Sequence, residues 1–109
     1  MEAQAKYITK EKTVVERIGL PALFEQTAEE CMELAHALLK YARKIRGENP
    51  TPKSEEEILH NVIEEMADVR LCLDEIDTEI FTDDERNEMF RIINRKQERW
   101  YKRLEEAGK

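Results

Sequence analysis

Residues 54–80 read SEEEILHNVIEEMADVRLCLDEIDTEI, and this stretch decides the fold because it joins a helix start to a long helical stripe. Ser54 followed by Glu57 is a capping box, in which each side chain satisfies a free backbone amide in the first turn of a helix. Apolar residues then recur at spacings of three and four, the period of an amphipathic helix. They are Ile58, Leu59, Val62, Met66, Val69, Leu73, Ile76 and Ile80. The pattern predicts one helix from Ser54 to about Ile80.

A second capping box lies directly after this stretch. Thr82 with Glu85 predicts a further helix, which ends near residues 107–108. Its apolar stripe consists of Met89, Phe90, Ile93, Trp100, Tyr101 and Leu104. Because Trp100 and Tyr101 fall on this stripe, we expect them to pack in the core rather than to stack on a base.

Proline and glycine residues mark the elements of the first half of the chain. Pro21 suits the first turn of a helix and Gly47 suits its C-cap, so we expect a helix from Pro21 to about Arg46. Pro50 and Pro52 oppose helix and predict a loop. Within residues 1–19, a short and weakly defined leading helix is expected over about residues 9–17.

The composition supports an all-α fold. Of 109 residues, 40% are hydrophobic and 39% are charged, with only three Gly and three Pro, a profile typical of helices with charged outer faces. The length predicts a single domain, residues 1–109, built as a compact bundle of four main helices. Four short amphipathic helices leave much apolar surface uncovered, so we expect homo-oligomerisation to complete the bundle as a dimer or tetramer.

Charge and hydropathy exclude some partners. The net charge of −7 argues against nucleic acid as a partner, since nucleic acid is itself a polyanion. No stretch approaches the roughly 20 apolar residues of a membrane span, and the N-terminus lacks a signal-like apolar segment. These features predict a cytoplasmic protein. Cys31 and Cys72 are isolated in sequence, and we expect both to be buried, reduced thiols.

Two acidic motifs lie on different predicted helices. Glu29-Glu30-x-x-Glu33 lies in the helix expected from Pro21 to about Arg46, and Glu65-x-x-Asp68 lies in the helix expected from Ser54 to about Ile80. At 100° per residue, the acids of both helices fall on the same edge of their apolar stripes. If the helices pack antiparallel, the carboxylates of Glu30, Glu33, Glu65 and Asp68 line one rim of the interface. Such a set of oxygen ligands favours a hard cation, Mg²⁺ or alternatively Mn²⁺.

The last helix repeats this arrangement with the opposite charge. Lys96 lies on the edge of its apolar stripe, Arg99 lies beyond it, and Arg103 is nearby. Acids that hold a metal on two helices, together with cations that hold phosphate on a third, predict a triphosphate site.

Together these motifs resemble the MazG-like family of all-α nucleoside triphosphate pyrophosphohydrolases. The stretch Asn94-Arg95-Lys96-x-x-Arg99 is similar to the N-x-K-x-x-R stretch of many MazG domains, and Gln26 ahead of the first acidic motif also fits. The resemblance covers about residues 20–103. The connection between the two acidic motifs is long for the family, and no distinctive motif precedes Gln26, so the substrate base is not indicated.

The resemblance implies a function and a role for each residue. The protein would hydrolyse an NTP or dNTP between the α- and β-phosphates, giving the monophosphate and pyrophosphate, with Mg²⁺ bound by the four acids named above. Glu29 would orient or activate the attacking water, or would hold a further metal. Lys96 and Arg99 would contact the phosphates. Gln26 and Asn94 would help to hold the nucleotide.

Two other functions compete with this interpretation. A di-iron carboxylate site would use the pairs Glu33-x-x-His36 and Glu57-x-x-His60, but both histidines fall on the side away from the apolar stripes. A non-enzymatic helical interaction module would also explain the amphipathic pattern. It predicts no stabilisation by Mg²⁺ and nucleotide, whereas an enzyme would be stabilised by its ligands.

Overall fold

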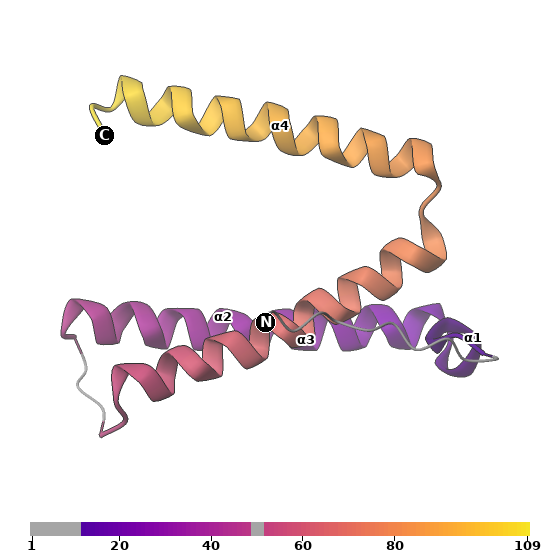
Figure 1. Ribbon diagram of the computed structural model, residues 1–109, viewed down its shortest axis with the longest axis horizontal. Helices are drawn as coiled ribbons and strands as arrows, with labels where there is room; N and C mark the ends of the chain where they lie inside the picture. The colour runs from indigo at the N-terminus through magenta and orange to yellow at the C-terminus, as the bar shows by residue number, and fades with distance from the viewer. Residues whose placement is uncertain (1–11, 49–51) are drawn as a thin grey trace, which may run out of the picture. The chain divides into compact units, whose positions relative to one another are not determined.

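The computed structural model describes residues 12–48 and 52–109, and within these ranges all regular structure is helical (Figure 1). The helices are α1 (Val14–Ile18), α2 (Leu20–Arg46), α3 (Glu55–Ile80) and α4 (Asp83–Glu106). The prediction of an all-α chain with four helices is confirmed. The expected start of the leading helix at residue 9, and Pro50 of the predicted loop, lie outside the described residues. Among the described helices, none is both long enough and apolar enough to span a membrane.

The predicted caps are present. The backbone amide of Glu57 donates to Ser54 Oγ at 3.2 Å, and that of Glu85 donates to Thr82 Oγ1 at 3.2 Å. In each pair the glutamate carboxylate accepts from the backbone amide of the cap residue, which completes both capping boxes. Gly47 closes α2 in the left-handed region, with φ at +74°. These local signals explain why α2, α3 and α4 begin and end close to the predicted positions.

The junction between α1 and α2 depends on Gly19. A capping box of Thr13 and Glu16 starts α1. It explains why the helix begins at Val14. Gly19 ends α1 by donating its amide to the carbonyl of Val15 at 2.8 Å. Its φ of +84° is a conformation that side chains with a Cβ rarely adopt, so glycine allows the chain to turn directly into α2. Pro21 then occupies the first turn of α2, as predicted.

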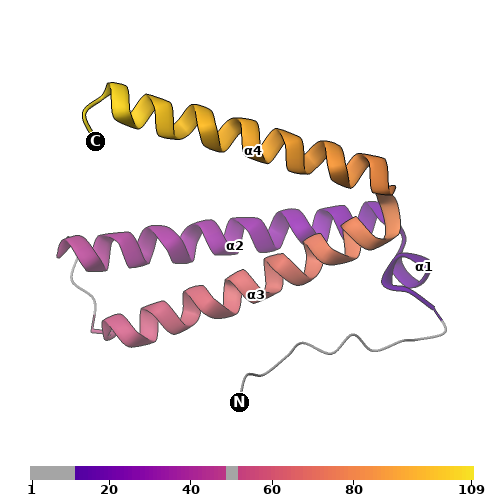
Figure 2. The same cartoon turned by 45° about the horizontal axis from the view of Figure 1, so that its top comes forward.

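The chain forms two compact units, the first extending to Ile76 and the second from Asp77 to Lys109. In the first unit α2 and α3 lie side by side and antiparallel, forming what we call the α2–α3 hairpin (Figures 1 and 2). Near the end of the hairpin where α2 leads into α3, the Tyr41 hydroxyl donates to Glu55 Oε1 at 3.3 Å. Further along, Glu33 lies close to Glu65. Moving back along α2 therefore corresponds to moving forward along α3, as expected for antiparallel helices.

The hairpin buries a narrow core between its helices. Its most buried residues are Leu23, Thr27 and Ala37 of α2 and Ile58, Val62 and Val69 of α3. Thr27 satisfies its hydroxyl within α2 by donating to the carbonyl of Leu23 at 2.7 Å, so this polar group is buried at little cost.

Only part of each predicted apolar stripe is buried. Phe24 and Leu38 of α2, and Leu59, Met66 and Leu73 of α3, are exposed. At 100° per residue these residues lie on the flank of each helix opposite to the acidic edge. The hairpin therefore has one apolar face and one acidic face. Cys31 is also exposed, so the prediction of a buried thiol is wrong for Cys31, while Cys72 is half-buried.

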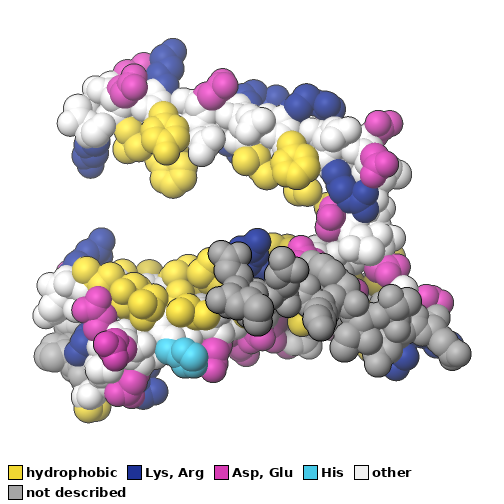
Figure 3. Space-filling view, viewed as in Figure 1, with side chains coloured by type: hydrophobic (Ala, Val, Ile, Leu, Met, Phe, Trp, Pro, Cys, Tyr) yellow, Lys and Arg dark blue, Asp and Glu magenta, His cyan; other side chains and the backbone are white. Residues whose placement is uncertain are grey.

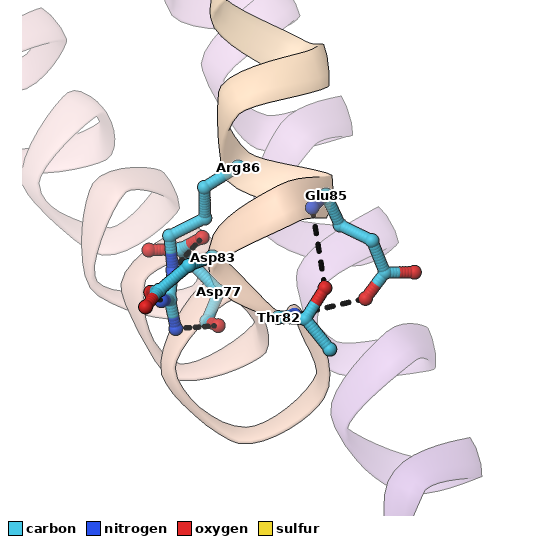
Figure 4. Close-up of polar contacts among 5 residues, drawn as sticks. All are labelled: Asp77, Thr82, Asp83, Glu85 and Arg86. Carbon is cyan, nitrogen blue, oxygen red and sulfur yellow. Dashed lines mark hydrogen bonds and ion pairs between the residues drawn. The ribbon is translucent and has the colours of Figure 1, made fainter.

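The second unit consists of the last turn of α3 and the whole of α4. Arg86 joins them, as Figure 4 shows: Nε lies 3.1 Å from Asp77 Oδ1, and Nη2 donates to the Asp77 carbonyl at 3.0 Å. Its Nη1 lies 2.8 Å from Asp83 Oδ1. The planar guanidinium thus bridges a helix end and the following helix start, a task that suits arginine better than lysine.

The apolar residues of α4 gather along one side of the helix (Figure 3). Trp100 and Tyr101 are 68% and 62% exposed, and with Gln97 and Leu104 they border a shallow cavity of about 140 Å³. The prediction that both aromatic residues pack in the core is therefore wrong. Within the second unit there is no second long helix, and a single helix cannot bury its own stripe.

Candidate metal site

Three of the predicted metal ligands come together on the acidic face of the hairpin. One carboxylate oxygen from each of Glu30, Glu33 and Glu65 lies within 4.8 Å of the others, and we call these residues the acidic triad. Glu30 and Glu33 are neighbours on α2 because residues three apart share a face of a helix. Glu65 reaches them from α3 because the antiparallel pairing places it opposite Glu33. The predicted convergence of acids from two helices is confirmed for these three residues.

The triad contains carboxylate oxygens without hydrogen-bond donors. Glu30 and Glu65 are half-buried, and the Oε2 atom of each is buried with no hydrogen-bond partner among the described residues. The other oxygen of Glu30 accepts from Gln26 Nε2 at 2.8 Å. Desolvated carboxylate oxygens without a donor are costly, and a cation is the usual remedy. The all-oxygen, anionic donor set fits a hard divalent cation.

The charges of the site disfavour ionisation of its own members. Burial raises the pKa of the Glu30 carboxyl above its ordinary value of 4.5, and the charge of Glu33 raises it further, partly offset by the Gln26 hydrogen bond. Burial also raises the pKa of Glu65, and the charges of Glu33, Asp68 and Glu30 add to this effect. A bound cation would reverse these shifts.

The remaining predicted residues of the first unit stand apart from the triad. Asp68 is close enough for its charge to affect Glu30 and Glu65, but its oxygens are not part of the 4.8 Å group. Glu29 is exposed and also lies outside that group. Gln26, which the resemblance assigns to the nucleotide, instead holds the Glu30 carboxylate through its amide. This hydrogen bond positions a triad member, and the predicted contact of Gln26 with a nucleotide stays a prediction.

Asn94, Lys96 and Arg99 lie on α4, in the second unit, and all three are exposed. Their proposed contact with the substrate of the acidic triad stays a prediction. Neither His36 nor His60 belongs to the 4.8 Å group of the acidic triad. His60 Nε2 lies 3.2 Å from the exposed carboxylate of Glu64 instead.

A cavity of about 240 Å³ adjoins the triad on the acidic face. It is lined by Glu33, His36, Ala37, Lys40, Asn61 and Glu65. Lys40 and Asn61 belong to none of the sequence motifs described above. Their spacing contains the signal: Lys40 follows Glu33 by two helical turns and Asn61 precedes Glu65 by one, so each pair shares a face.

The raised pKa values predict an unusual pH dependence for the metal-free protein. Because folding favours the protonated form of Glu30 and Glu65, the associated stability is present below pH 4.5 and is lost as the pH rises through the raised pKa values. We therefore expect Glu65→Gln to raise the melting temperature in EDTA by a few degrees at pH 7 and to have a smaller effect at pH 4.5.

Thermal unfolding of both proteins across this pH range tests the expectation. Glu25→Gln, at an exposed position of α2 outside the acidic triad, is the matched control and should behave like the wild type at every pH. A Glu65→Gln protein that melts below the wild type in EDTA at pH 7 would contradict the electrostatic explanation.

Comparison of the chain with protein-family models, with curated proteins and with solved structures finds no match.

Proposed function

We propose that this protein is a Mg²⁺-dependent nucleoside triphosphate pyrophosphohydrolase, which converts an NTP or dNTP to the monophosphate and pyrophosphate in the cytoplasm. The observation that carries the proposal is the acidic triad, with its two buried carboxylate oxygens that lack donors. The resemblance of the acidic and basic motifs to the MazG-like family supplies the reaction. A triad that fits a divalent cation is consistent with a motif that implies a triphosphate, because nucleoside triphosphates bind to enzymes together with Mg²⁺.

Each residue has a role in this proposal. Glu30, Glu33 and Glu65 bind the cation, and Asp68 adds negative charge beside them. The cation, Mg²⁺ or alternatively Mn²⁺, would neutralise charge that develops on the phosphate oxygens. Water attacks phosphorus, the α–β anhydride bond breaks, and Glu29 orients the water and accepts its proton.

The basic residues of α4 complete the proposal. Lys96 and Arg99 would stabilise the negative charge of the pyrophosphate leaving group, and Asn94 would help to hold the nucleotide. This assignment depends on the sequence motif. It requires α4 to approach an acidic triad, within one chain or between copies of the chain.

We also propose that the protein is a homo-oligomer. Many large apolar side chains of the hairpin and of α4 are exposed, among them Phe24, Met66 and Trp100. Contiguous exposed apolar surface commonly marks a site of interaction with another protein. Sedimentation equilibrium should give a mass at least twice that of the chain. Replacing Met66 with Glu on the apolar face should shift the population towards monomer, whereas Glu64→Gln should not.

The apolar faces also favour the second candidate, a non-enzymatic interaction module. Pyrophosphate release from a panel of NTPs and dNTPs, in Mg²⁺ and in EDTA, separates the two candidates. The enzyme gives release that requires Mg²⁺, and its melting temperature rises with Mg²⁺ and nucleotide. A folded protein that shows neither response would reject the enzymatic proposal.

A further inference from the structure

We propose that the cavity beside the acidic triad binds the phosphate chain of the substrate, and that the Lys40 ammonium donates a hydrogen bond to a phosphate oxygen there. The inference rests on the proposed function, because the cation held by the triad is what would anchor the phosphates. It goes beyond that function by adding a phosphate contact from the hairpin itself, in addition to the predicted contacts from α4.

The cavity has acids at one end and a cation towards the other. Glu33 and Lys40 both line it from α2, seven residues apart, which is about 10.5 Å along the helix and about 20° around it. Asn61 and Glu65 line the opposite wall from α3. Ala37 lies between Glu33 and Lys40, and its small side chain leaves the space open. A polyanion anchored at the triad can therefore extend along α2 to Lys40.

The charge of Lys40 is available to a ligand. Lys40 is exposed, and within residues 12–48 and 52–109 its ammonium forms no ion pair or hydrogen bond. It does not neutralise the triad directly, since it lies two turns from Glu33.

The lining favours phosphate over a nucleobase. Among the described residues that line the cavity, Ala37 is the only aliphatic one and His36 the only aromatic one. Base recognition in proteins commonly uses stacking on aromatic rings or on an arginine plane, and a single exposed imidazole offers little such surface. An ammonium, an amide and an imidazole are instead hydrogen-bond donors suited to anionic oxygens.

Calorimetry with inorganic tripolyphosphate tests the inference. The full chain is first titrated with Mn²⁺ alone and is then titrated with tripolyphosphate at saturating Mn²⁺. We expect Lys40→Gln to bind Mn²⁺ like the wild type but to bind tripolyphosphate about tenfold more weakly, the effect of losing one charge-assisted hydrogen bond. Lys40→Arg should restore binding to within about threefold of the wild type.

Arg46→Gln is the matched control, because it removes the same charge from an exposed position about 120° around α2 from Lys40. Its tripolyphosphate affinity should stay within about twofold of the wild type. If Lys40→Gln binds tripolyphosphate like the wild type, or no more weakly than Arg46→Gln does, the phosphate contact is rejected while the metal site stands. If the wild type does not bind Mn²⁺, the proposed function fails, and this inference fails with it.

Discussion

Glu33→Ala should reduce Mg²⁺-dependent pyrophosphate release by at least about a hundredfold, since even residues that only support a metal ligand change metal affinity by about 10–100-fold. The fold should remain intact, because Glu33 is exposed and its removal leaves no internal cavity. Metal-free Glu33→Ala should melt at or above the temperature of the wild type, because the charge of Glu33 raises the pKa of both Glu30 and Glu65. Initial rates and thermal unfolding in EDTA measure the two effects.

Glu25→Ala is the control for this variant. Glu25 is also an exposed glutamate of α2, but it lies outside the triad. Its replacement changes the net charge equally and should leave both the rate and the melting temperature close to those of the wild type. Wild-type turnover by Glu33→Ala would exclude the triad as the metal site, even if the protein proves to be a pyrophosphohydrolase.

Ile58→Ala should destabilise the protein by about 2–5 kcal/mol, the usual cost of truncating a buried isoleucine to alanine. Ile58 is 2% exposed and lies in the core of the hairpin near the start of α3. The core is narrow, so neighbouring side chains have little freedom to fill the space that is left. Urea unfolding followed by circular dichroism measures the loss as a lower midpoint.

Ile63→Ala is the matched control, because Ile63 lies one turn further along α3 and is 55% exposed. The same truncation there should cost less than about 1 kcal/mol at protein concentrations where the chain is monomeric. Equal losses for Ile58→Ala and Ile63→Ala under those conditions would contradict the assignment of the core to the α2–α3 hairpin.

The helices could be predicted well because their boundaries depend on local chemistry. Ser54, Thr82 and Gly47 act through backbone groups within four residues of themselves, so the sequence alone identifies them. Burial could not be predicted as well. Periodicity shows that Cys31 and Trp100 lie on apolar stripes, but it does not show which part of a stripe another helix covers.

The candidate site was predicted in part for a related reason. Helical phase placed Glu30, Glu33 and Glu65 on one edge, and this was sufficient because the antiparallel pairing aligned them. Phase does not specify side-chain conformations, which leave the Asp68 oxygens outside the triad. Lys40 could not be predicted to line a cavity, because the cavity is formed by residues of two helices, with Asn61 on the opposite one.

The hydrogen bond from Gln26 to Glu30 Oε1 bears on the choice of cation. With one lone pair of that oxygen engaged by an amide donor and Oε2 without any donor, the arrangement favours coordination of a cation by Glu30 through Oε2 alone rather than through both oxygens. Ca²⁺ accepts six to eight oxygens and often takes both atoms of a carboxylate, whereas Mg²⁺ requires a compact octahedron of single contacts. Gln26 would therefore make the site discriminate against the larger ion without touching either one.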